Sequence, residues 1–70
     1  MLLEITPYCS TDFTKEHSKT INTDRIVSIE GVNGRGEKIR PGFSLLIMEN
    51  ASANCFIDEM TVSKIKQIMK

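Results

Sequence analysis

The feature that most constrains this chain is a dense group of turn-forming residues near its middle. They all fall between positions 31 and 42: Gly31, Asn33, Gly34, Gly36, Pro41 and Gly42. Glycine and proline interrupt both helices and strands, so no regular element can run through this region. Asn33-Gly34 is also a common sequence in tight β-hairpin turns. We therefore predict a long, flexible hairpin loop over residues 33–42.

The segments on either side of this loop have the pattern of β strands. Residues 20–32 carry a turn-like step at Asn22-Thr23-Asp24 and then an apolar strand that contains Ile26, Val27 and Ile29. Residues 43–48 are a nearly continuous apolar run, which predicts a central strand buried on both faces. A polar turn over 49–54 then leads to a last short strand at 55–57.

The N-terminal part predicts one more strand and a loop. Residues 2–8 favour a strand in which Leu3 and Ile5 share a face, and Pro7 places that strand at an edge or marks its end. Residues 9–19 are polar and lack an apolar period. This stretch predicts a loop or a short helical turn, with Phe13 as its one apolar anchor.

The C-terminal part has the period of a helix. From residue 60 to residue 70, apolar side chains recur at helical spacing and lysines occupy the other face. Thr61 is the predicted N-cap, and Asp58 and Glu59 precede it where the helix dipole favours negative charge. The lysines Lys64, Lys66 and Lys70 fall toward the end of the helix, where positive charge is favoured.

Together these elements predict an α+β fold in a single domain over residues 1–70. We expect a small curved antiparallel sheet or an SH3-like barrel of about four to five strands, with a C-terminal helix. A chain of 70 residues buries a small core, even with a hydrophobic share of 40%. Domains of this size often gain stability from a disulfide, a metal or self-association.

Composition argues against several functional classes. The chain has 9 basic and 9 acidic residues, whereas dedicated nucleic-acid-binding domains usually have a basic excess. No signal peptide or apolar membrane-spanning run is present. Two cysteines, Cys9 and Cys55, are too few for a secreted disulfide framework. We therefore expect a cytoplasmic protein with free thiols, no membrane contact and Cys55 in the core.

No residue set indicates catalysis, a metal or a cofactor. Metal-binding side chains occur at Cys9, Asp12, His17 and Cys55, but no pair has the spacing typical of structural zinc. A nucleophilic pair of Cys9 and His17 is equally weakly indicated, and His17 is expected on the surface. The carboxylates show no paired arrangement for acid–base chemistry. We therefore expect a protein that is not an enzyme, without cofactor or metal.

The hairpin loop carries the candidate ligand- or partner-binding residues, which are Asn33, Arg35, Lys38 and Arg40. Glycine amides and arginine side chains can hold a phosphate or contact an acidic protein surface. The alternative is a solvated hairpin tip without a ligand. The sequence leaves both interpretations open, and likewise leaves open whether the helix lysines only complement the dipole or extend a basic surface.

A family resemblance extends over about residues 20–70. Its motifs are Ile21-Asn22-Thr23-Asp24-Arg25-Ile26-Val27-Ser28-Ile29-Glu30 and the Cys55-Phe56-Ile57-Asp58-Glu59 step into the helix. This pattern resembles the small FlbD-like (SwrD-like) bacterial proteins and similar phage-encoded proteins. The resemblance implies a small barrel or curled sheet with a terminal helix, no catalytic residues and a bacterial or phage origin. The long loop and the Glu59-Met60 step depart from the family pattern.

These observations favour a small non-catalytic binding protein that acts through protein contacts. We expect a homo-oligomer, because the core is small and the helix has more apolar residues than one face needs, with Met48 and Met60 adding to them. In a bacterial or phage setting such a protein would be a regulator or inhibitor. The alternative is a nucleotide- or nucleic-acid-binding barrel that uses the basic loop.

Overall fold

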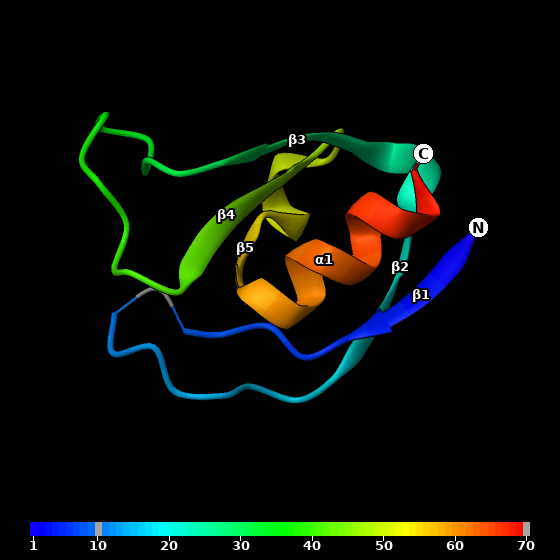
Figure 1. Cartoon of the computed structure of the whole chain (residues 1–70), viewed down its shortest axis with the longest axis horizontal. Coiled ribbons are helices and arrows are strands. Elements are labelled where there is room, and N and C mark those ends of the chain that lie inside the picture. The colour runs from blue at the N-terminus through cyan, green and yellow to red at the C-terminus, as the bar shows by residue number, and fades with distance from the viewer. Residues whose placement is uncertain (10, 70) are drawn as a thin grey trace.

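The computed structural model describes residues 1–9 and 11–69. Five strands form two antiparallel sheets, and one α helix follows them (Figure 1). The elements in chain order are β1 (Leu2–Ile5), β2 (Lys19–Asn22), the 3-10 helix η1 (Thr23–Arg25), β3 (Ile26–Glu30), β4 (Phe43–Met48), the 3-10 helix η2 (Ala51–Ala53), β5 (Cys55–Asp58) and α1 (Glu59–Ile68). The predicted α+β class and the C-terminal helix are confirmed.

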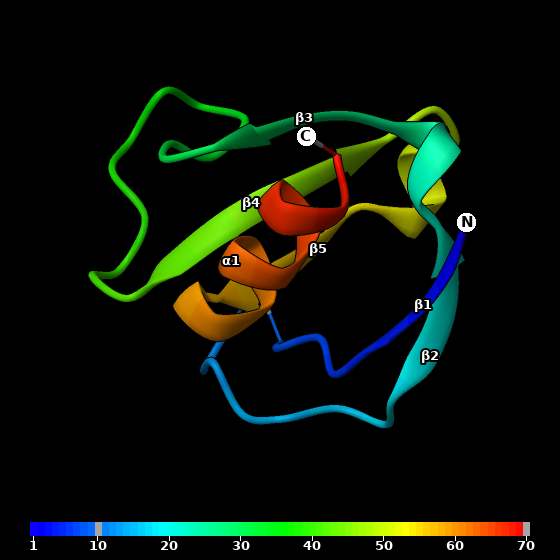
Figure 2. The ribbon, with the colours of Figure 1, turned by 45° about the vertical axis from the view of Figure 1, so that its right-hand side comes forward.

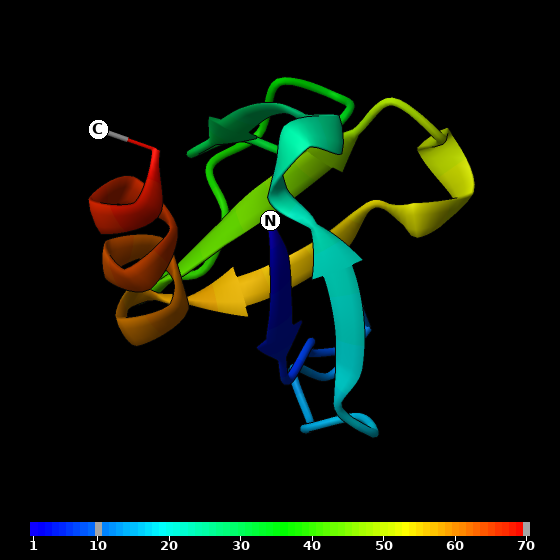
Figure 3. The same cartoon turned by 90° about the vertical axis from the view of Figure 1, so that its right-hand side faces the viewer.

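The two sheets are a hairpin and a three-stranded sheet. Strands β1 and β2 pair with Leu3 opposite Ile21, so Leu3, Ile5 and Ile21 share one face. The larger sheet has the order β3-β4-β5, which confirms the predicted central position of β4. The strands are assigned to two sheets and not to one closed barrel, and Figure 3 shows the β1–β2 hairpin running across the larger sheet.

The predicted segment 20–32 holds two strands that belong to different sheets. Strand β2 ends at Asn22, whose side-chain oxygen accepts the N–H of Asp24 at 3.0 Å and so forms the cap of η1. Strand β3 then begins at Ile26 and pairs with β4. The turn-like step predicted at Asn22-Thr23-Asp24 is confirmed, and this turn is what separates the two strands.

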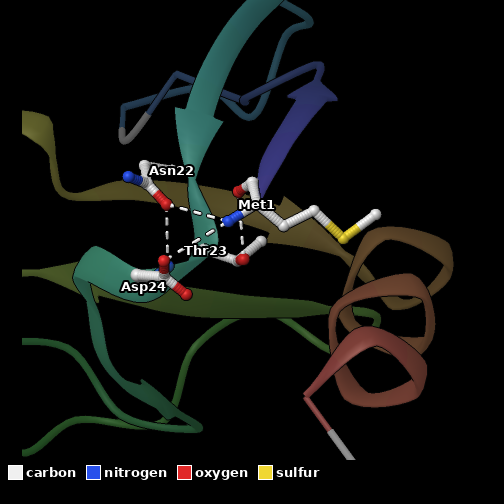
Figure 4. Close-up of polar contacts among 4 residues, drawn as sticks. All are labelled: Met1, Asn22, Thr23 and Asp24. Carbon is white, nitrogen blue, oxygen red and sulfur yellow. Dashed lines mark hydrogen bonds and ion pairs between the residues drawn. The ribbon is translucent and has the colours of Figure 1, made fainter.

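Polar contacts join the start of β1 to this turn (Figure 4). The amino group of Met1 lies 3.2 Å from Asn22 Oδ1 and 3.4 Å from Asp24 Oδ2. The Met1 carbonyl accepts hydrogen bonds from the N–H and the hydroxyl of Thr23, at 2.8 and 3.0 Å. Thr23 is buried, and these bonds satisfy its polar groups.

The hydrophobic core lies between the larger sheet, the helix and the β1–β2 hairpin. Leu46 of β4, Ile57 of β5 and Ile65 of α1 each have 0% exposure. Ile5, Ile21 and Met48 complete the buried cluster. The helix lies over one face of β4 and β5 (Figure 2), and the fully buried side chains come from that face. Met48 therefore belongs to the core and does not add to the exposed apolar surface, contrary to the prediction.

The helix begins two residues before its predicted N-cap. Asp58 is the N-cap, and its Oδ1 accepts the N–H of Thr61 at 2.9 Å. The prediction of Thr61 as the cap was wrong because the short aspartate side chain reaches the third amide of the helix, which is the amide of Thr61 itself. Residue 70, the end of the predicted helical range, lies outside the described residues. Among those described, no helix has the length and apolar character to span a membrane.

Candidate functional site

The loop between β3 and β4 is a hairpin connection, as predicted, and it has internal structure. The pair Val32 and Lys38 forms an isolated antiparallel bridge within the loop. The N–H of Ile39 donates to the Gly31 carbonyl at 3.1 Å. These contacts close the base of the loop, so its tip is a short turn held between two bridged segments.

Asn33 organises the tip of this loop. Its side-chain oxygen accepts the N–H groups of Arg35 and Glu37 at 2.9 and 3.1 Å, and its side-chain amide lies 3.3 Å from Glu37 Oε1. Gly36 has φ +80°, a conformation that glycine adopts without strain, and its N–H donates to the Asn33 carbonyl. The side-chain oxygen of Asn33 is thus engaged by the loop backbone. Asn33 therefore holds the shape of the loop and would position other residues for contact with a ligand.

The three loop cations are exposed. Arg35, Lys38 and Arg40 take part in no salt bridge within residues 1–9 and 11–69. Arg40 is placed by an aromatic contact, since its guanidinium carbon lies 5.6 Å from the centre of the Phe13 ring. The structure therefore brings one of the predicted binding residues, Arg40, against the loop that contains Phe13.

All four aromatic residues of the chain form one cluster on the face of the sheet opposite the helix. The Phe13 ring lies 4.8 Å from that of Phe43 and 5.3 Å from that of Phe56, between ring centres. Tyr8 meets Phe43 edge-on at 4.8 Å. The sequence indicated Phe13 as an anchor, and this is confirmed. The joint cluster was not predicted, because Tyr8 and Phe13 lie in a segment without periodicity.

Phe13 reaches this position through an unusual backbone conformation. Its φ is 57°, in the left-handed region that bulky residues rarely adopt. The turn is held by hydrogen bonds from the Phe13 N–H to the Cys9 carbonyl at 3.0 Å and from the Cys9 N–H to the Thr14 carbonyl at 2.9 Å. Asp12 supports the same turn, and the hydrogen bonds it accepts from Thr14 lower its pKa.

Tyr8 and the helix cap share one carboxylate. The Tyr8 hydroxyl donates to Asp58 Oδ2 at 3.0 Å while Oδ1 holds the helix amide. Burial acts to raise the pKa of Asp58, but the hydrogen bonds from Thr61 and Tyr8, with the charge of Lys15, lower it overall. Burial and the neighbouring carboxylate raise the pKa of Tyr8. The arrangement ties the aromatic cluster to the helix and engages both oxygens of this carboxylate in structural hydrogen bonds.

The residues considered for a metal site do not converge into one. No group of three or more histidine, cysteine, aspartate or glutamate side chains in the described part of the chain could hold a metal ion. His17 is exposed, as predicted. Both thiols are free and half-buried, and burial raises the pKa of Cys55, which packs against the core as expected.

A second candidate surface lies beside the end of the helix and was predicted only in outline. Among the described residues the most exposed large apolar side chains are Met1, Leu2, Val27, Met60 and Met69, and of these Met1 and Met69 belong to this surface. Met1, Ile26, Ile68 and Met69, together with the polar residues Thr23 and Asp24, line a pocket of about 320 Å³ beside the η1 turn. Figure 4 shows the Met1 side chain extending from β1 toward the helix. We call this pocket the helix-end groove.

The comparisons with known proteins give no relative for this chain. No family model matches it, and neither the curated proteins nor the solved structures that were searched contain a match. The functional argument therefore depends on the contacts, exposure and charges described above.

Proposed function

We propose that this protein is a small non-catalytic binding module that acts through protein–protein contacts and self-associates through the helix-end groove. The observation that carries the proposal is the exposure of large apolar side chains around this groove, where Met69 is 52% and Met1 64% exposed. Exposed apolar side chains that gather at one place typify interaction surfaces. A second copy is the favoured occupant, because a formal net charge of zero brings no net repulsion between copies.

The polar groups of the chain support a non-catalytic role. The carboxylate of Asp58, whose pKa is lowered, is engaged by the Thr61 amide and the Tyr8 hydroxyl. Structural pairing of this kind accounts for its lowered pKa without a catalytic function. The module would work by contact with a partner surface, without a cofactor or metal, and in the cytoplasm.

Light scattering coupled to size-exclusion chromatography tests self-association. We expect a dimer or larger species at micromolar concentration, and we expect Met69→Lys to dissociate it. Met60→Lys is the matched control, since Met60 is 73% exposed on the same helix but does not line the groove. A wild-type monomer throughout the micromolar range would overturn the proposal, as would equal effects of the two substitutions.

A second function is favoured by the loop cations. Arg35, Lys38 and Arg40 are exposed, and Arg40 lies over an aromatic ring, as in sites that bind nucleotides or single-stranded nucleic acid. Asn33 would hold the loop in shape for this binding. Fluorescence polarisation with single-stranded, double-stranded and cyclic nucleotides tests it. Binding should be lost in the Arg35→Ala, Arg40→Ala double variant and retained in Lys64→Ala, Lys66→Ala; binding that survives the loop substitutions would exclude this function.

The finer assignments form part of the same proposal. A partly closed, SH3-like arrangement is supported by the contact of Tyr8 with β5 and by the direct passage from β2 through η1 into β3. The FlbD-like pattern over about residues 20–70 supports a bacterial or phage regulator or inhibitor. The genomic neighbourhood of the gene tests this proposal. Neighbouring flagellar genes would favour an FlbD-like protein, and a phage early region would favour an inhibitor or ligand-binding role.

A further inference from the structure

The two cysteines lie on neighbouring segments although they are far apart in sequence. Tyr8 forms an antiparallel bridge with Phe56 of β5, and the Tyr8 N–H donates to the Phe56 carbonyl at 2.9 Å. In an antiparallel pair, the residue after one partner faces the residue before the other. This register places Cys9 opposite Cys55, one position beyond the Tyr8–Phe56 bridge.

The backbone of Cys9 confirms which type of pair this is. Its N–H and carbonyl bond to Thr14 and Phe13, at 2.9 and 3.0 Å, and so point away from β5. If the Tyr8–Phe56 register continues by one residue, Cys9 and Cys55 occupy a non-hydrogen-bonded position, at which the two Cα atoms of an antiparallel pair are typically about 4.5 Å apart and the side chains project from the same face. This separation lies within the range that a disulfide spans.

Both cysteines also border an accessible space. They line one pocket of about 300 Å³ together with Glu16, Asn33 and Phe56. The Cys9 sulfur lies 3.6 Å from the Thr11 hydroxyl oxygen and also interacts with the Asp12 carboxylate, so a rotation of Cys9 about its Cα–Cβ bond breaks only weak hydrogen bonds of the thiol. Both thiols are therefore free, border the same accessible pocket and flank one antiparallel bridge.

We propose that Cys9 and Cys55 form a dithiol site that undergoes thiol–disulfide exchange with low-molecular-weight disulfides and closes an internal Cys9–Cys55 disulfide. In the first step the Cys9 thiolate attacks one sulfur of the small disulfide RSSR, which gives a Cys9–SR mixed disulfide and releases RS⁻. In the second step the Cys55 thiolate attacks the Cys9 sulfur and expels the second RS⁻. The protein loses two protons and two electrons, and RSSR is reduced to two thiols.

The position of Cys55 favours this order. Cys55 is half-buried, and burial raises the pKa of its thiol, so it reacts less readily with a reagent in solution. Held opposite the Cys9 mixed disulfide, it attacks within the molecule and gains from proximity. The product would fasten the Phe13 turn to β5. This inference is independent of the proposed self-association.

The test uses the whole folded protein and oxidised glutathione as the small disulfide. We expect loss of both free thiols, with a proteolytic peptide that contains the Cys9–Cys55 crosslink under non-reducing conditions, and only trace glutathionylated protein. Closure should be at least roughly tenfold faster in the native protein than in the urea-unfolded chain, because the fold raises the effective concentration of the second thiol. Cys55→Ala should instead accumulate the Cys9 mixed disulfide.

Two results would overturn the proposal. One is a stable glutathione adduct on wild-type Cys9 without internal crosslinking, which would show that Cys55 cannot reach Cys9. The other is an equal closure rate in the native and unfolded chains, which would show that the fold does not position the pair. Cys9→Ala checks the order of attack and should react more slowly with glutathione than Cys55→Ala does.

Discussion

Helix α1 covers one face of the β3–β4–β5 sheet, and residues from two loops cover the other. The helix-covered face is aliphatic, and Leu46, Ile57 and Ile65 on it are fully buried. The opposite face carries the rings of Phe43 and Phe56 under Phe13, which a turn at positive φ holds in place. One face thus depends on regular elements, and the other on a strained turn.

The two faces differ in what they contribute: the helix-covered face contributes most to stability, and the loop-covered face contains residues that can change conformation. The face that is covered by the helix and the β1–β2 hairpin gains stability from close packing and burial of apolar side chains. A face covered by loops keeps half-buried rings and exposed cations next to one another, as with Phe13 and Arg40. Segments that bind are commonly of the second kind, because loop residues can differ in conformation without loss of the core. The predictions below measure how unequal the two faces are.

The largest effect is expected on the helix-covered face. Ile57→Ala should lower the free energy of unfolding by about 2–5 kcal/mol, because it leaves a cavity where the side chain is fully buried. Leu45→Ala is the matched control on the opposite face, where the side chain is only half-buried, and it should cost less than about 2 kcal/mol. Urea denaturation measures both. Equal losses would mean that the two faces do not differ in stability.

The helix-covered face is also the part that the sequence predicted best. The apolar run of β4, the strand at Cys55–Asp58 and the helical period of α1 each appear within one continuous segment, so local pattern suffices to find them. The split of residues 20–32 between two sheets was not predictable from the pattern, because both strands look alike and only the pairing partner differs. The N-cap was misplaced because Asp58 and Thr61 are both good capping residues.

The candidate site was predictable only in part. The sequence shows the basic residues of the loop directly. Their exposure is also predictable, because charged side chains in a glycine-rich loop usually lie at the surface. The cluster of Tyr8 and Phe13 with Phe43 and Phe56 depends on long-range folding of a segment without period, and the placement of Cys9 opposite Cys55 depends on the register of a single bridge. Register across distant segments is set by the whole fold and leaves no local signal.

The next effect concerns the strained turn on the loop-covered face. Phe13→Ala should destabilise the protein by roughly 1–3 kcal/mol, because a half-buried ring and its two aromatic contacts are lost. Phe13→Gly removes the same ring but adopts φ 57° without strain, so it should be more stable than the alanine variant by about 1 kcal/mol. Thermal and urea unfolding of both variants test this. A less stable glycine variant would show that the turn carries no strain.

A smaller effect is expected at the junction between the two faces. Asp58→Ala should cost about 1 kcal/mol through loss of the helix cap, whereas Asp58→Asn keeps an oxygen for the Thr61 amide and should cost less. Because the pKa of Asp58 is lowered in the folded state, its charge adds stability above the usual aspartate pKa, and this stability is lost as pH falls through the folded pKa. Urea titrations at neutral pH and at acid pH below the usual aspartate value should therefore show a larger loss for wild type than for Asp58→Asn. Parallel losses would mean that the carboxylate charge does not contribute.

The smallest effect on stability is expected for the arginines of the β3–β4 loop. Comparing their effects on stability and on binding distinguishes a structural role of the loop from a binding role. Arg40→Gln should lower stability by only about 0.5–1 kcal/mol, since an exposed cation over an aromatic ring contributes little. Arg35→Gln is the control in the same loop, without a ring contact within the described residues, and should leave stability unchanged within error.

If the loop binds anionic ligands, both substitutions should weaken binding despite this difference in stability, because each removes one exposed positive charge. Stability measured by urea unfolding and affinity measured by fluorescence polarisation would then rank the variants differently. If the two measurements rank them alike, the role of Arg40 is to cover Phe13, and the loop-covered face would be a second, weaker core and not a binding surface.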